Sequence, residues 1–413
     1  MFTAFSTALS ALSAHSTAID VVGNNLANLN TPGFKSSVVS FYDLVTQSLG
    51  AGRTQVGFGV GRPDTIRQFI QGAIKTSSGE LDVAIQGDGF LVLKNPLDNI
   101  PNYSRGGNLL VDKSGILLTA TGQRVQGWTQ TNGVLATSGP ISDIVVPVGT
   151  IKPPIVSTEF SFDINLDAAA SAGPPPTTFS SSIEIFDSLG GSHIVTTTFT
   201  KNVTANVWDY SIIVPDTDVT TPITPVTGAV TFDSAGKLID PPPAGPFPSI
   251  NITGLVDGAA DLTLAWQMFT GTTPKLTQFA QPSAVSANQQ NGSPASQLLR
   301  VGIGNGGVVL AQYSNGQQIV VGQLAMASIR NPESLMAVGN NNYALSAGSA
   351  SPVVGVPGTG GRGNIMGGAT ENSNVDIARE FTNLIVLQRG YQANARVITT
   401  VDELSQETIN LKR

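Results

Sequence analysis

The chain has 413 residues, of which 40% are hydrophobic and only 12% are charged, with a formal net charge of −7. This length predicts several domains, and the hydrophobic fraction is sufficient for packed cores. The negative charge and the lack of a basic cluster argue against nucleic acid as a partner. The absence of cysteine excludes disulfides, thiolate catalysis and cysteine-based zinc sites. No apolar run approaches the roughly 20 residues that span a bilayer, so membrane insertion is not expected.

The first stretch of the chain has the spacing of a helix that packs on another helix. Apolar residues recur in steps of three, four and seven, which predicts an amphipathic helix over residues 3–28. The predicted seam consists of Phe2, Phe5, Leu9, Leu12, Ile19 and Leu26. Pro32 and Gly33 mark the end of the helix, because the first favours an extended preceding residue and the second tolerates positive φ. No Lys or Arg precedes Lys35, so a cleaved secretory signal is not expected.

The last stretch repeats this pattern. Its seam consists of Phe381, Leu384, Tyr391, Ala395 and Ile398, and it drifts to Val397, Val401, Leu404 and Leu411. The helix is expected to begin near residues 373–376, with Ser373 or Asn374 as its N-cap and Asp376 in its first turn. The two terminal helices are therefore expected to pair with each other.

The long middle of the chain is predicted to be β-rich. Residues 34–62 are expected to form an extended connector that could include a short helix, and Gly355–Gly368 a flexible return. A clear strand pattern begins at Gly79, and Gly87-Asp88-Gly89 predicts a hairpin turn between two strands.

Turn signals divide the remaining strands. Hairpin turns are predicted at residues 112–115, 187–190, 233–236 and 315–316, each of which combines Asp or Asn with Gly, and at Asn132-Gly133. Lys152-Pro153-Pro154 marks a boundary, after which residues 155–290 alternate between strands and Pro-rich loops. This block is predicted to be a separate sandwich or barrel.

These patterns predict a mainly β protein with α-helical termini and discontinuous, nested domains. The N- and C-terminal helices pair as a coiled-coil stalk, from which two β-rich domains project. The expected domains are a helical core of 1–31 with 370–413, an extended connector of 32–78 with about 350–369, an inner β domain of 79–150 with 291–349, and an outer β sandwich or barrel of 151–290.

Three motifs resemble those of the bacterial flagellar rod and hook proteins. The first is GNNLANLNTPGFK at residues 23–35, and the second is LDVAIQGDGF at residues 81–90. The third is SNVD at residues 373–376, followed by QRGYQANA at residues 388–395. Within this family the extra block of residues 155–290 favours the hook branch, because rod proteins lack a large insertion there.

The resemblance implies a structural role. A hook-type subunit self-assembles into a curved helical homopolymer that couples rod to filament and transmits torque around an export channel. The implied partners are other copies of the chain, the distal rod, hook cap and hook–filament junction proteins, and the flagellar type III export apparatus. The expected location is the extracellular hook and basal body, reached by export without a cleaved signal peptide. The alternatives are a straight distal-rod subunit and a secreted β-rich adhesin with a coiled stalk.

No catalytic, cofactor or metal site is predicted. Two G-x-G-x-x-G patterns, Gly302–Gly307 and Gly358–Gly363, lack the strand-to-helix context of a dinucleotide site. The two histidines, His15 and His193, lie far apart in sequence, which argues against catalytic zinc or a Ser-His-Asp triad. His15 is expected on the polar face of its helix. The chain is therefore not expected to be an enzyme.

Asparagines near the ends of the seams leave two interpretations open. Asn24, Asn25 and Asn28 either cap a frayed helix end or bridge neighbouring helices in an assembly, and the resemblance favours bridging. Gln388, Arg389 and Asn394 present the same choice. The predicted assembly core comprises Phe2, Phe5, Leu9, Leu12, Ile19, Asn24, Asn25, Leu26, Asn28, Thr31, Pro32, Gly33, Phe34, Asn374, Val375, Phe381, Leu384, Gln388, Arg389, Tyr391, Asn394, Ala395, Ile398 and Leu404.

Overall fold

The computed structural model describes residues 2–44, 47–48, 55–131 and 134–410, and the chain divides into two compact units. The helical unit comprises Met1–Val148, Arg300–Gln312 and Gln318–Arg413, and the sandwich unit comprises Gly149–Leu299 and Tyr313–Gln317. The predicted turn at Asn132-Gly133 and the seam residue Leu411 lie outside the described residues. Among the described helices, none is long and apolar enough to cross a membrane.

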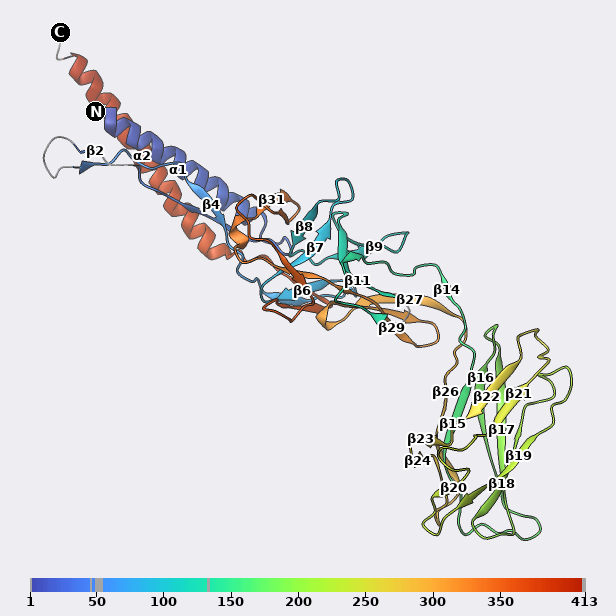
Figure 1. Cartoon of the computed structure of the whole chain (residues 1–413). Coiled ribbons are helices and arrows are strands. Elements are labelled where there is room, and N and C mark those ends of the chain that lie inside the picture. Colours follow the sequence, from blue (N-terminus) through green and yellow to red (C-terminus); the bar gives the residue numbers. More distant parts are fainter. Residues whose placement is uncertain (1, 45–46, 49–54, 132–133, 411–413) are drawn as a thin grey trace. The chain divides into compact units, whose positions relative to one another are not determined.

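Two long helices lie at the ends of the chain, α1 (Phe2–Ala27) and α2 (Ile377–Asn410). They pack side by side, which confirms the predicted pairing of the ends (Figure 1). The predicted N-cap of α2 is wrong, because the Asp376 Oδ1 accepts the backbone N–H of Ala378 at 2.8 Å and of Arg379 at 3.1 Å. Asp376 is therefore the cap, and its carboxylate also suits the positive end of the helix dipole.

Short antiparallel strand pairs follow α1 and precede α2. They are β1 (Ser37–Ser40) with β4 (Asp64–Arg67), β2 (Gln47–Ser48) with β3 (Gln55–Val56), β5 (Ile74–Thr76) with β35 (Ala369–Glu371), and β6 (Val83–Gln86) with β34 (Asn364–Gly367). The described part of residues 34–62 contains no helix, so that expectation is wrong there. The expected flexible return at Gly355–Gly368 instead contains β34, which is paired along its whole length.

A larger antiparallel sheet forms the body of the helical unit. Its strands are β7 (Phe90–Lys94), β8 (Pro101–Ser104), β9 (Leu109–Val111), β10 (Leu117–Thr119), β11 (Arg124–Thr131), β12 (Val134–Leu135), β13 (Ser142–Asp143), β14 (Ile151–Lys152), β27 (Ser296–Ile303), β28 (Val308–Tyr313), β29 (Gln318–Leu324), β30 (Met326–Ser328), β31 (Met336–Gly339), β32 (Asn342–Ala344) and β33 (Val353–Gly355). Two 3-10 turns, η1 (Asn305–Gly307) and η2 (Pro332–Ser334), lie between these strands. β29 pairs with β11, and β30 pairs with β7. Strands that precede the sandwich unit in the sequence therefore share one sheet with strands that follow it. Phe90, Tyr103, Trp128 and Tyr343 are buried in one core cluster of this unit.

The hairpin predicted at Gly87-Asp88-Gly89 is wrong. β6 pairs with β34, whereas β7 pairs with β8, β11 and β30, so the motif carries the chain from one sheet to another. Gly89 has φ +130, and a Cβ there would lie 2.6 Å from the Met326 Cε. Glycine is required because the chain passes this close to β30 in a conformation that L side chains rarely adopt.

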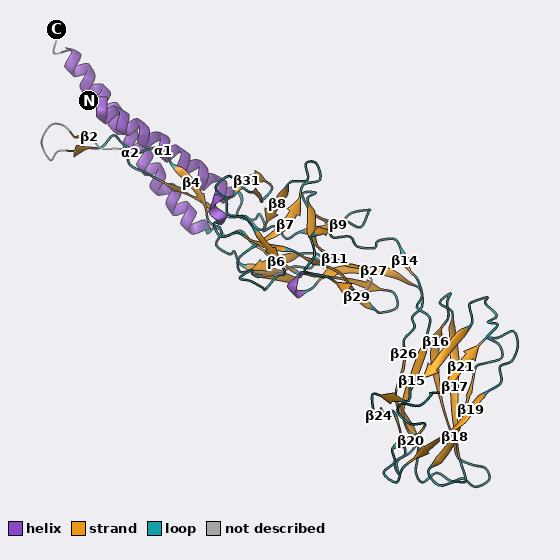
Figure 2. Cartoon of the chain, viewed as in Figure 1, coloured by secondary structure: helices purple, strands orange, loops and turns teal. Residues whose placement is uncertain are grey.

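The sandwich unit consists of two sheets around one core, and Figure 2 draws it as strands joined by loops. One sheet contains β15 (Glu159–Asn165), β21 (Ser249–Ile252), β22 (Leu262–Trp266), β25 (Leu276–Thr277) and β26 (Ala284–Gln290), and the other β16 (Thr178–Phe186), β17 (Ser192–Lys201), β18 (Val207–Ile213), β19 (Val226–Phe232) and β20 (Leu238–Asp240). β23 (Phe269–Thr270) and β24 (Thr273–Pro274) form a separate pair. Trp208 and Trp266 are fully buried between the sheets, and alternate residues of β17 and β18 point into this core.

Four predicted turns are confirmed. In the turns at residues 112–115, 187–190 and 233–236, the aspartate Oδ1 accepts two backbone N–H groups and the glycine has positive φ. Asn315-Gly316 joins β28 to β29, with Gly316 at φ +80. Gly302–Gly307 spans the end of β27 (Ser296–Ile303) and the turn that leads into its neighbour β28. On its other side, β27 pairs with β14 (Ile151–Lys152).

Candidate assembly interface

Small apolar side chains of α1 are buried in the single chain, namely Ala8, Ala14, Ala18 and Val22. Between the two helices, a Cβ at Gly390 would lie 2.8 Å from the His15 ring. The glycine therefore allows α1 and α2 to approach closely at this point.

His15 lies in this contact, not on the polar face where it was expected. The imidazole is half-buried against Gly390, and its ring centroid is 5.7 Å from that of Phe41. An imidazole fits here because the glycine leaves a space that any larger residue would fill.

Much of the predicted seam lies outside the contact between the two helices. Phe5 is 41% exposed, Leu9 is 54% exposed and Phe381 is 50% exposed. Other seam residues are half-buried in the single chain: Leu12, Ile19, Leu26, Leu384, Ala395 and Ile398. Further exposed apolar residues on α2 are Ile377, Ile385, Val386, Tyr391, Val397, Leu404 and Ile409. The Phe2 side chain lies outside the described set.

An apolar groove opens beside these helices. It has a volume of about 210 Å³ and runs between α1, β1 and α2. Its lining includes Val21, Val38, Phe41, Val386 and Leu387. Contiguous apolar surface of this kind typically marks a protein–protein contact, because it is costly to leave in water.

The asparagines of α1 divide into different roles. Asn25 is 1% exposed, and it donates from Nδ2 to the Ser37 carbonyl at 2.8 Å and accepts the Ser37 N–H at Oδ1 at 2.9 Å. Asn28 donates to the Asn24 carbonyl and accepts from the Thr31 hydroxyl, so it closes the end of α1. The Asn25 amide is therefore bound within its own chain, and bridging between subunits stays a prediction for these asparagines.

We expect Asn25→Ala to destabilise the helical unit by about 1–3 kcal/mol, because the buried Ser37 backbone groups lose both partners. Asn24→Ala removes an exposed amide from the same turn and serves as the control, with an expected change of about 0.5 kcal/mol or less. Urea unfolding followed by circular dichroism at the helix band measures both. Equal effects of the two substitutions would contradict the assignment.

A buried ion-pair cluster ties the segment after α1 to the segment before α2. The Lys35 Nζ donates to the Glu371 Oε1 at 2.7 Å, and the Arg105 Nη1 lies 3.6 Å from the Glu371 Oε2. The Glu371 Oε1 also accepts the Gly72 N–H at 2.8 Å. Burial lowers the pKa of Lys35, and the charge and hydrogen bond of Glu371 oppose this shift. Two cations thus share one carboxylate out of contact with water.

The first motif is explained by this cluster. Gly33 has φ +70, and a Cβ there would lie 2.9 Å from the backbone of Arg105 and Gly106. Phe34 is buried, whereas Pro32 is exposed and its carbonyl accepts the Asn341 Nδ2 at 3.0 Å. The glycine therefore lets the chain approach this backbone closely and bring Lys35 to Glu371.

The third motif is anchored in the same region. Asn374 accepts the Ser36 N–H at 2.7 Å and donates to the Gln68 and Ile70 carbonyls, which is why it does not cap α2. Val375 is buried beside it. Further along α2, Gln388 and Arg389 are exposed, and the half-buried Asn394 donates to the Gly390 carbonyl of its own helix.

Comparison with known proteins places each part of the chain in one family. Residues 5–35 match the family model described as flagella basal body rod protein, and residues 366–411 match the flagellar basal body rod FlgEFG protein C-terminal model. Between them, residues 84–167 match the flagellar hook protein FlgE/F/G D1 domain, and residues 162–293 match the flagellar basal body protein FlaE D2 domain. The flagellar hook protein FlgE of Borreliella burgdorferi is 32% identical, over 98% of this chain and 98% of its own. That of Escherichia coli is 31% identical, over 99% of this chain and 100% of its own. The chain belongs to the flagellar hook protein family.

This hook-family chain is a structural subunit of the flagellar hook. Its fold is also similar to the crystal structure of Helicobacter pylori flagellar hook protein FlgE2, with a TM-score of 0.53 at 15% identity over 71% of this chain and 99% of that one. The hook-branch interpretation of the sequence motifs is thereby confirmed.

The sequence of this hook-family chain does not reveal which residues pair with Lys35 of the first motif. Glu371 and Arg105, which form the buried ion-pair cluster with it, lie outside all three motifs. A signal was present, because only 12% of residues are charged and Glu371 is an isolated charge in a Gly-rich stretch. The sequence could not pair it with Lys35, since the two residues lie at opposite ends of the chain.

Proposed function

We propose that this hook subunit polymerises into a curved helical tube through its terminal helices, which enclose an export channel. The observation that carries this proposal is that large apolar side chains on the terminal helices are exposed in the single chain. Ala8, Ala14, Ala18 and Val22 of α1 are buried in the single chain, while Phe5, Leu9 and Phe381 remain exposed. Burying such side chains against other copies is worth roughly 25 cal/mol per Å² of apolar surface. Non-closing contacts between identical subunits generate an open helix.

The predicted assembly core belongs to this proposal as a set. Its exposed and half-buried seam residues would contact neighbouring subunits. Its buried members, among them Asn25, Gly33, Phe34 and Val375, would hold the helices in position from within one chain.

The partners and location follow from the family. Hook proteins link rod and filament, and the chain belongs to the hook and basal body. We infer contacts with the distal rod, hook cap and hook–filament junction proteins, and export through the flagellar type III apparatus to the extracellular end of the hook. The relatives are structural hook proteins, and the role proposed for this chain is structural, without catalysis.

The four-part domain division is proposed to separate mechanical tasks. The core of 1–31 with 370–413 and the connector of 32–78 with about 350–369 would carry axial load. The β domains of 79–150 with 291–349 and of 151–290 would slide past their neighbours as the tube bends. Uncharged Ser, Thr and Gly loops suit contacts that break and re-form.

The polymer proposal is tested by negative-stain electron microscopy of the purified full chain under salting-out conditions, beside a chain that lacks residues 1–30. We expect curved tubes from the full chain and none from the truncated one, because the truncation removes one half of the helix pair. Straight tubes would favour a rod-type subunit. Monomers from both chains would contradict polymerisation and favour an adhesin.

A second variant tests the role of the sandwich unit. Ile155 and Ser293 exchange two backbone hydrogen bonds, at 2.9 and 2.8 Å, so a short Gly-Ser linker can replace residues 156–292. Tubes that form but do not curve are expected. A variant tube with normal curvature would remove the mechanical role proposed for 151–290.

A further inference from the structure

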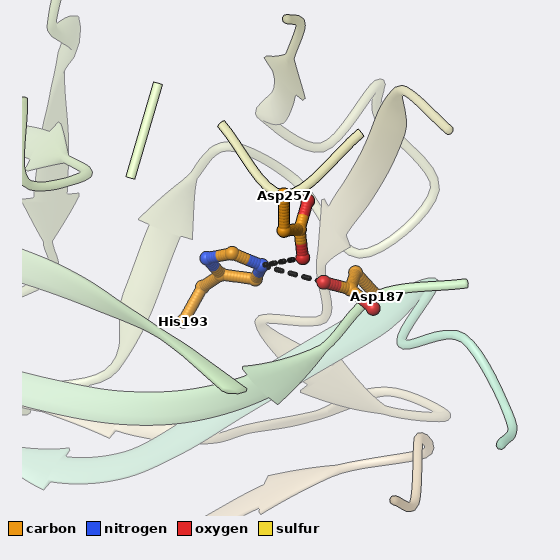
Figure 3. Close-up of side chains that lie close together, drawn as sticks. All are labelled: Asp187, His193 and Asp257. Atoms are coloured by element: carbon orange, nitrogen blue, oxygen red, sulfur yellow. Dashed lines mark hydrogen bonds and ion pairs between the residues drawn. The ribbon is translucent and has the colours of Figure 1, made fainter. Parts of the chain in front are cut away.

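Four polar side chains meet in the sandwich unit, two from the β16–β17 hairpin and one from each of two other loops. Asp187 follows β16, His193 lies in β17, Asp218 lies between β18 and β19, and Asp257 lies between β21 and β22. The His193 Nε2 is 2.8 Å from the Asp187 Oδ2 and 3.9 Å from the Asp257 Oδ2 (Figure 3). The His193 Nδ1 is 3.2 Å from the Asp218 Oδ2. Asp187 and His193 are buried, whereas the Asp257 side chain is 36% exposed.

We propose that this cluster binds a divalent first-row transition cation such as Zn²⁺, with the His193 Nε2, the Asp187 Oδ2 and the Asp257 Oδ2 as its ligands. Ligand atoms about 2.1 Å from a tetrahedral metal lie about 3.4 Å from one another. The two distances from the His193 Nε2, 2.8 and 3.9 Å, bracket this spacing, and one ligand atom from each residue lies within 4.8 Å of the others. Imidazole and carboxylate together suit borderline ions of this class.

The orientation of the imidazole supports the proposal. Both ring nitrogens of His193 lie within hydrogen-bond distance of a carboxylate, Nδ1 of Asp218 and Nε2 of Asp187. In the tautomer that carries its proton on Nδ1, this proton is donated to Asp218 and the Nε2 lone pair is available to a cation between the Asp187 and Asp257 carboxylates. A histidine ligand whose other nitrogen donates to a carboxylate is the usual arrangement at metal sites. Asp218 would therefore be a positioning residue.

Each ligand carboxylate is held by one oxygen and offers the other. The Asp187 Oδ1 accepts the N–H groups of Leu189 and Gly191, and the Asp257 Oδ1 accepts the Ala259 N–H. The turn at Asp233 has the same backbone bonds, so it shows that the turn needs only Oδ1 of its aspartate. The turn therefore does not require the Asp187 Oδ2, whose partner in this structure is the His193 Nε2.

Gly191 keeps the space between the carboxylates open. A Cβ there would lie 2.5 Å from the Asp187 Oδ2 and 2.9 Å from the Asp257 Oδ2. No larger residue fits at this position without displacing both oxygens. The exposed side of Asp257 leaves room for ion entry and for a water ligand.

The charge of the cluster favours a divalent ion. Three carboxylates surround one imidazole, and a divalent cation neutralises more of this charge than the single proton of an imidazolium. A bound ion would join the sheet of β16 and β17 to the β21–β22 loop of the other sheet.

The test uses the purified full chain, stripped with EDTA, desalted and titrated with ZnCl₂ by isothermal calorimetry near neutral pH. We expect one Zn²⁺ per chain. At a Zn²⁺ concentration of 100 times the Kd, the unfolding midpoint of the sandwich unit should rise by roughly 5–10 °C in scanning calorimetry. Asp257→Asn should weaken binding by at least about tenfold, and Asp218→Asn by about 10–100-fold.

Asp216→Asn is the matched control, because it removes an exposed carboxylate from the loop that carries Asp218. It should bind Zn²⁺ like the parent chain. Asp257→Asn changes a partly exposed side chain, and near-UV circular dichroism of Trp208 and Trp266 verifies that it folds. No Zn²⁺ binding by the parent chain up to about 1 mM would overturn the proposal, as would equal binding by all of these variants.

Discussion

Replacing Glu371 by Gln is expected to destabilise the helical unit by about 3–5 kcal/mol. Gln keeps the shape and the acceptor oxygen of Glu371 but leaves Lys35 and Arg105 as two buried cations without a counter-charge. Breaking a buried ion pair in this way leaves an uncompensated charge out of water, which is the costly part of such substitutions. Urea unfolding followed at the circular-dichroism helix band reports on this unit, because α1 and α2 both belong to it.

Two comparisons separate this explanation from a general effect of losing a carboxylate. Glu80→Gln removes the partner of Arg300 at 2.9 Å, but both side chains are about half exposed, so a change of about 0.5 kcal/mol or less is expected. Lys35→Met should cost less than Glu371→Gln, because Glu371 then still has Arg105. Equal losses from the substitutions at Glu80 and Glu371 would contradict the buried-charge account.

Local chemistry was sufficient to predict the turns. Aspartate at the start and glycine near the end of residues 112–115, 187–190 and 233–236 form their bonds within a few residues, so distant contacts hardly affect them. At Gly87–Gly89 the same reasoning failed. A hairpin signal only states that the chain can turn, and pairing of β6 with the distant β34 decided where the next strand went.

The helix ends show a similar limit. Asp376 and Asn374 are both good N-caps by residue type. Only the engagement of Asn374 by Ser36, Gln68 and Ile70 leaves the role to Asp376, and those residues come from the other end of the chain. The His193 cluster was out of reach for the same reason, since Asp218 and Asp257 come from loops distant in sequence from the hairpin that carries Asp187 and His193.

The heptad pattern predicted both terminal helices and their pairing, but not the face that each turns to the other. A large apolar residue such as Leu9 is an equally good seam residue whether it meets its own partner helix or another copy of the chain. Ala14 and Ala18 carry little hydrophobic signal, yet both are buried in the single chain. The sequence therefore predicts where the apolar surface lies, but not whether it contacts the partner helix or another subunit.

We expect Leu9→Gln and Phe381→Gln to block polymerisation while the monomer stays folded. Both side chains are about half exposed in the single chain, so the free energy of unfolding should change by about 0.5 kcal/mol or less. If they are buried between subunits, each loses about 1.5–3 kcal/mol of contact energy. Because 1.4 kcal/mol corresponds to a factor of ten, the critical concentration should rise about tenfold or more for each substitution.

Sedimentation of polymer from a concentration series, with electron microscopy of the pellets, measures this change. Leu9→Met and Phe381→Leu are the matched controls, because they keep an apolar side chain at the same positions and should polymerise near the parent concentration. A glutamine variant that polymerises like the parent would place these residues outside the subunit contact. A glutamine variant that unfolds the monomer would instead assign them to the packing of α1 on α2. The proposal requires that the glutamine variants lose assembly and keep an intact fold. That result is expected if the large apolar residues of the helix pair contact other subunits.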